Sequence, residues 1–150
     1  SDVYASAEIF YSLGALMAGV FIRKIFKHKN IIYSIIALLV LTTLIFYTVA
    51  FTKSTGIFYV FSLFIGVTNA GARVLRTTYL FNHISNDIIG RTNSVFNVIN
   101  ILLRSLFLLL FSLAWFSKDS NITWAYFICG SFTLLSAFLL ARDYKKLKNN

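Results

Sequence analysis

The sequence predicts an all-α membrane protein built as a bundle of five transmembrane helices. Of its 150 residues, 58% are hydrophobic and only 13% are charged, and there is no proline. A soluble domain of this size would need far more polar surface. The apolar residues form five continuous runs, each close to the roughly 20 residues that cross a hydrocarbon core. Because the runs do not alternate between polar and apolar residues, a transmembrane barrel is excluded.

The runs place helices at about residues 3–26, 30–52, 56–82, 91–117 and 121–143. They leave no room for a separate soluble domain, so a single transmembrane domain is expected. The second and fifth helices are apolar on nearly every face and are expected to face lipid. The first, third and fourth carry the polar groups and most of the glycines. These three are expected to line whatever the protein encloses.

Small residues and cationic flanks shape the expected packing and orientation. Gly14 and Ala18 in the first helix, and Gly66 and Ala70 in the third, follow the small-xxx-small pattern that lets helices approach closely in lipid.

Nine cationic residues flank alternate helix ends: Arg23, Lys24, Lys27, Lys29, Arg91, Arg142, Lys145, Lys146 and Lys148. The positive-inside rule then places the N-terminus outside and the C-terminus in the cytoplasm. Topology explains the net charge of +9, so lipid and not nucleic acid is the expected partner.

Charges inside the apolar runs are the candidate functional residues. Arg104 is the only charge between residues 92 and 116. At the centre of a spanning helix an arginine costs about 2.5 to 3.5 kcal/mol, so it is usually kept where it faces a cavity or a partner charge. Glu8 lies at a similar depth, and two interpretations stay open: it shares a cavity with Arg104, or it reaches the outer interface. Arg73 and Arg76 lie toward the cytoplasmic end of the third helix, where either can line the cavity or extend to the interface.

Two polar stripes accompany these charges. In the fourth helix Asn93, Asn97 and Asn100 share one face with Arg104, because their spacings are four, three and four. In the third helix Ser62, Gly66 and Asn69 continue toward the two arginines. Such stripes either bond neighbouring helices or line a path for solute, and both alternatives stay open for the asparagines.

Nothing in the sequence indicates an enzyme. Cys129 is the single cysteine, and the two histidines, His28 and His83, are too few and too far apart for a zinc site. No nucleophile elbow or zinc-protease motif is present. Neither catalysis nor a cofactor or metal is therefore expected.

Two segments resemble sequences of the major facilitator superfamily. The stretch from Gly19 to His28 is similar to its loop motif G-x-x-x-D-[RK]-x-G-[RK]-[RK]: Gly19, Lys24 and Lys27 fit, whereas Arg23, Phe26 and His28 depart from it. The stretch Asp87-Ile-Ile-Gly90-Arg91 is similar to the acidic-x-x-Gly-Arg turn that often follows the fourth helix of each half.

The resemblance covers nearly the whole chain and implies helices eight to twelve of a twelve-helix transporter, most similar to bacterial efflux members. It implies export of a small molecule by alternating access, driven by a proton gradient across the bacterial inner membrane. It also implies that helix seven and the N-terminal half are missing from this fragment. Gly19, Lys24, Lys27, Asp87, Gly90 and Arg91 would form cytoplasmic gate loops. No family motif marks the cavity candidates, which are chosen by helix face and depth. They are Arg104, Asn100, Asn97, Asn69, Arg73 and Glu8. The alternative is a stand-alone five-helix subunit or scaffold without transport activity.

Overall fold

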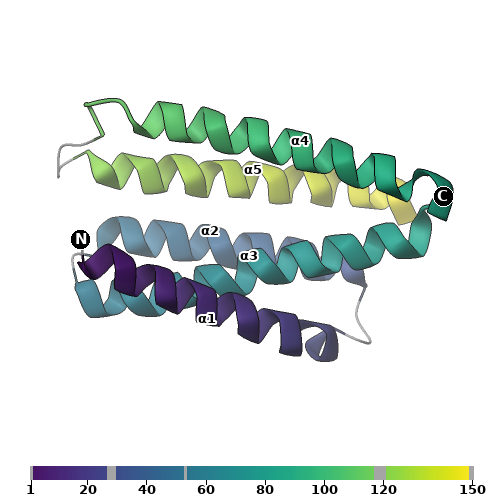
Figure 1. Cartoon of the computed structure of the whole chain (residues 1–150), viewed down its shortest axis with the longest axis horizontal. Coiled ribbons are helices and arrows are strands. Elements are labelled where there is room, and N and C mark those ends of the chain that lie inside the picture. The colour runs from purple at the N-terminus through teal and green to yellow at the C-terminus, as the bar shows by residue number, and fades with distance from the viewer. Residues whose placement is uncertain (1, 27–29, 53, 117–120, 149–150) are drawn as a thin grey trace.

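The computed structural model describes residues 2–26, 30–52, 54–116 and 121–148, and all its regular structure is helical. The helices are α1 (Asp2–Ile25), α2 (Ile31–Phe51), α3 (Thr55–His83), α4 (Asn86–Phe111) and α5 (Ile122–Lys148). All five are long and apolar enough to cross a membrane. Consecutive helices run antiparallel, with α4 and α5 on one side of the bundle and α1, α2 and α3 on the other (Figure 1). The five predicted membrane-length helices are confirmed.

Aromatic side chains at the helix ends fit this membrane placement. Trp115 and Trp124 lie on either side of the α4–α5 connection, and both are about half exposed. Tyr33 and Tyr144 pack together at the opposite end, with ring centroids 4.5 Å apart. Tryptophan and tyrosine favour the two membrane–water interfaces, where an apolar ring and a polar tip are both satisfied. The aromatic residues thus mark both ends of the bundle.

Close contact between α1 and α3 follows from two glycines. A Cβ on Gly14 would overlap the carbonyl oxygen of Leu63, and a Cβ on Gly66 would overlap that of Tyr11. Each glycine therefore lies directly on the backbone of the other helix. Ala18, one turn beyond Gly14, is only 1% exposed. The small residues act here as the close-packing pattern predicts.

The apolar helix α2 is packed on two sides, contrary to the expectation that it mainly faces lipid. It lies between α3 and α5 and buries Ser34, Thr42 and Thr43. These hydroxyls donate to backbone carbonyls four residues earlier, as Thr42 does to Leu38 at 2.8 Å, so their burial leaves no orphan donor. Thr43 also lies 2.9 Å from the Thr133 hydroxyl of α5. Polar residues that are locally satisfied let an otherwise apolar helix occupy the interior.

Helix α4 is the peripheral one. It begins and ends earlier than the predicted 91–117, and none of its residues is buried. Ser85 stands at the N-cap position and Asp87 lies in the first turn, where a negative charge suits the helix dipole. At the other end Ser112 donates its hydroxyl to the carbonyl of Leu109 at 2.7 Å, which closes the helix.

Candidate functional site

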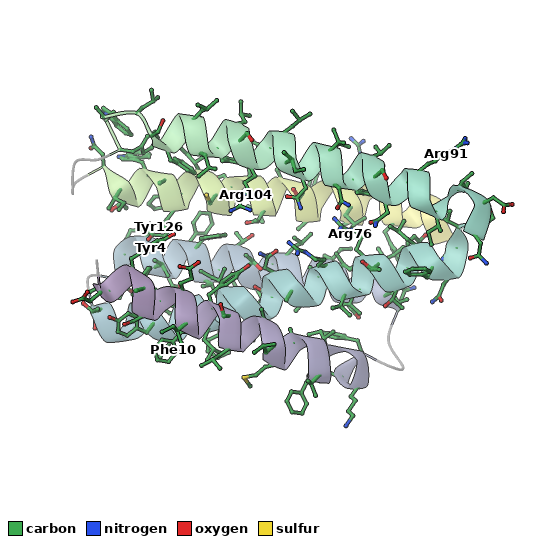
Figure 2. All side chains as sticks on the ribbon, in the orientation of Figure 1. Tyr4, Phe10, Arg76, Arg91, Arg104 and Tyr126 are labelled. Atoms are coloured by element: carbon green, nitrogen blue, oxygen red, sulfur yellow. The ribbon has the colours of Figure 1, made fainter. Side chains whose placement is uncertain are left out.

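The candidate site is the polar face of α4 together with the part of α3 that lies opposite. Asn97, Asn100 and Arg104 are all exposed, as is Asn93 at the start of the stripe. None of the four forms a hydrogen bond or ion pair with another residue of the described ranges. Figure 2 shows Arg104 reaching from α4 toward the side of the bundle on which α2 and α3 lie. The stripe is available to a ligand or to another polypeptide.

Arg76 is the point where α3 meets this face. Its guanidinium carbon lies 5.0 Å from the centre of the Phe96 ring of α4, a cation–π contact. The Nε atom of Arg76 is buried and has no hydrogen-bond partner within the described part of the chain. Phe96 and Asn100 are four residues apart, so the ring and the polar stripe adjoin on α4.

The depth of this contact favours the cavity interpretation of Arg76 over the interfacial one. Arg76 lies seven residues before the end of α3, whereas Phe96 lies ten residues after the start of α4. Side chains on a helix lean toward its N-terminus, which for α3 is away from the α3–α4 connection. The guanidinium therefore leans into the span instead of out toward the near interface. The contact between this partly buried arginine and the Phe96 ring joins α3 to α4.

Asn69 bonds a neighbouring helix. Its side-chain amide donates to the Tyr11 hydroxyl of α1 at 2.7 Å. Glu8 lies one turn before Tyr11 on the same side of α1 and is exposed. Of the two roles left open for the asparagines, bonding between helices is the one observed for Asn69. The bond keeps a polar group of α1 beside the α3 stripe.

The remaining cavity candidates are not brought into direct contact. Arg73 and Glu8 are exposed, and neither forms an ion pair or hydrogen bond with another described residue. Glu8 lies 17 residues before the end of α1 and Arg104 lies 18 residues after the start of α4, so the two remain at similar depth. No ion pair joins them, and the helix on which α1 packs is α3. A direct Glu8–Arg104 pair is absent in this conformation.

The predicted gate residues are helical where the structure describes them. Gly19 and Lys24 lie within α1, and Asp87, Gly90 and Arg91 form the first two turns of α4. Lys27 falls outside the described residues. A Cβ on Gly19 or Gly90 would meet nothing within 4 Å, so close packing does not require either glycine. The absence of any helix-breaking proline is consistent with continuous helix at these positions.

Sequence reasoning missed two partners in this region, Phe96 and Tyr11. Both stand at helical spacing from a predicted site residue: Phe96 precedes Asn100 by four positions, and Tyr11 follows Glu8 by three. Aromatic residues adjoining a polar stripe were the available signal. Within the described residues, no group of three or more His, Cys, Asp or Glu side chains could hold a metal ion.

The fold defines a class of protein: an all-α chain whose five helices are each suited to a membrane. The comparisons add no family to this description. No family model matches the chain, and no significant similarity was found to a curated protein or to a solved structure.

Proposed function

We propose that this chain is part of a secondary active transporter that exports a small molecule by alternating access, coupled to a proton gradient. Alternating access needs a polar site near the middle of the membrane that two groups of helices enclose in turn. Here α1, α3 and α4 carry polar residues in the middle of their spans. The chain would supply helices eight to twelve of a major facilitator superfamily transporter, and helix seven and an N-terminal half of the same polypeptide would supply the rest.

The observation that carries the proposal is the free polar face of α4. Arg104 and the asparagines Asn97 and Asn100 lie well inside a 26-residue helix, and no described residue forms a hydrogen bond or ion pair with them. An arginine at such a depth costs about 2.5 to 3.5 kcal/mol on insertion scales and is usually retained at functional sites. A face of this kind suits a helix that lines a watery cavity.

The charge distribution supports an orientation for the transporter. Lys24, Arg91 and Arg142 lie near the ends of α1, α4 and α5 that the antiparallel arrangement brings to one side (Figure 1). We infer that this side is cytoplasmic, in a bacterial inner membrane. In a Cys129→Ala background, Ser54→Cys should react with an impermeant maleimide from outside, and Asn86→Cys only after the membrane is opened. The reverse pattern would overturn the orientation.

Transport is tested with the full-length protein in proteoliposomes. A pH-sensitive dye trapped inside reports proton movement as a panel of small molecules is added. Arg104→Ala should abolish substrate-dependent proton flux while membrane insertion is retained, because the cavity loses its central charge. Arg142→Ala is the matched control: this side chain is 63% exposed at the end of α5 and pairs with Asp143. Wild-type flux from Arg104→Ala would remove Arg104 from the site.

The second candidate function is a five-helix membrane subunit without transport activity. It is favoured by the same lack of buried residues on α4, since a partner protein in the membrane could cover that helix. No flux from the full-length protein, together with a stable complex that Arg104→Ala dissociates, would support this alternative over transport.

A further inference from the structure

All the charges in the middle of α3 and α4 are positive. Arg73 and Arg76 on α3 and Arg104 on α4 lie well inside the two helices. The one acidic residue of α3 and α4 is Asp87, in the first turn of α4 at the end of the bundle. The charges of these two helices therefore make the electrostatic potential between them more positive near the middle of the membrane, where Glu8 of α1 is the acidic residue at similar depth. In low dielectric, such a potential strongly favours an anion.

The side chains of Arg73 and Arg104 lean toward the same depth in the membrane. Asn69 is the middle residue of α3, and Arg73 lies about 6 Å from it toward the α3–α4 connection. Arg104 lies about 8 Å from the middle of α4 on the opposite side of the midplane. Each side chain leans toward its own helix N-terminus, which is toward the midplane in both cases. Asn69, Asn97 and Asn100 are among the polar side chains at that depth.

The three arginines differ in what they can still bind. Arg76 is partly enclosed and contacts Phe96. Arg73 and Arg104 are exposed and have no partner among the described residues, so their guanidinium groups present free donors. A planar guanidinium matches a carboxylate or phosphate through two parallel hydrogen bonds. Amide groups such as Asn97 and Asn100 can add further neutral hydrogen bonds.

We propose that the transported molecule carries a negatively charged carboxylate or phosphate group, which binds between Arg73 and Arg104 at mid-depth. This inference rests on the proposed transport function, since it names the substrate class of that site. The ligand is a small-molecule anion and not a lipid, because lipid headgroups lie at the membrane surface, roughly 15 Å from the midplane of a 30 Å core.

The test compares two probes of one shape and opposite charge, 9-anthracenecarboxylate and 9-(aminomethyl)anthracene. Binding to the full-length protein is measured by fluorescence in phosphatidylcholine nanodiscs, with empty nanodiscs as background. The carboxylate should bind at least tenfold more tightly than the amine. Arg73→Gln and Arg104→Gln should each weaken carboxylate binding about tenfold or more, the usual loss for a charge-assisted hydrogen bond. Arg142→Gln should leave binding unchanged.

Further variants and lipids separate the alternatives. Arg104→Lys should keep the preference for the carboxylate but bind it less tightly, since lysine retains the charge and loses the planar fork. Replacing half of the phosphatidylcholine by phosphatidylglycerol should change the carboxylate Kd by less than about twofold. Displacement by phosphatidylglycerol would assign the arginines to a lipid headgroup and overturn the proposal. Equal affinity for both probes would also overturn it.

The outcome is distinguishable from failure of the transport function. If the protein shows proton-coupled flux but binds the two probes equally, the anionic substrate class is refuted and the transport function is retained. Carboxylate-selective binding without any flux retains the anion site and refutes transport. Far-UV circular dichroism and a single elution peak confirm that each variant is folded before its affinity is compared.

Discussion

Replacing Gly14 by alanine should separate α1 from α3. The added Cβ would overlap the Leu63 carbonyl oxygen, with the carbonyl carbon at 2.9 Å and the Val67 nitrogen at 3.1 Å. All three atoms belong to the backbone of α3, so no side-chain rotation can relieve the overlap. The helices must therefore move apart, and contacts along the whole crossing weaken. Overpacking of this kind costs about 1 to 3 kcal/mol.

Gly19→Ala is the matched control on the same helix. A Cβ at Gly19 meets nothing within 4 Å, so the substitution adds no clash. Alanine is also the better helix former, by up to about 1 kcal/mol in water. Gly19→Ala should therefore be neutral or slightly stabilising. The two variants contain the same atoms and differ only in where the methyl group lies.

The difference is measured by reversible unfolding in mixed micelles, with helicity followed as the fraction of denaturing detergent rises. Gly14→Ala should unfold at a lower detergent fraction than the wild type, and Gly66→Ala should match it because its Cβ would overlap the Tyr11 carbonyl oxygen. Equal stability of Gly14→Ala and Gly19→Ala would refute the close crossing of α1 and α3.

Three further predictions concern single contacts between helices. Thr43→Val should lower the free energy of unfolding by about 0.6 kcal/mol, because the Thr43–Thr133 contact at 2.9 Å is one hydrogen bond between α2 and α5. An unchanged stability in the same micelle titration would count against that bond. Tyr11→Phe removes the acceptor of Asn69 and should cost a similar amount, whereas Tyr4→Phe, at a 74% exposed position, should cost nothing. Phe96→Leu should lower the free energy of unfolding by about 0.5 to 2 kcal/mol, because Arg76 loses the aromatic ring that it contacts. In an Arg76→Leu background the same substitution should not lower the stability through this contact.

Much of the fold could be predicted because membrane helices are recognised by the length and composition of their apolar runs. The five runs, their order and the two small-xxx-small patterns are local properties of the sequence, whereas the pairing of α1 with α3 is visible only in the structure. The position of α2 was not predictable in this way. Hydropathy treats Thr42 and Thr43 as mildly polar, but it does not record that their hydroxyls bond their own helix and so permit burial.

The candidate site was predictable only as a set of faces. The spacing of Asn97, Asn100 and Arg104 places them on one side of α4 wherever that helix begins. The helix ends six residues earlier than predicted, and this does not change which residues share that side. Contacts between helices depend on side-chain shape and on which faces meet, and periodicity carries neither. Arg76 shows the limit: its spacing did not distinguish the interface from the interior, but its contact with Phe96 does.

The contrast between α4 and the other helices bears on why Arg104 is present. Gly14 and Gly66 join α1 to α3, and the hydroxyls of Thr43 and Thr133 meet between α2 and α5, so buried contacts explain these residues through stability. Arg104 contributes no such contact, because α4 buries none of its residues. A charge that costs free energy on insertion and has no described partner is not explained by the stability of this bundle. The proposed anion site would account for its retention, because Arg73 and Arg76 on α3 are positive as well.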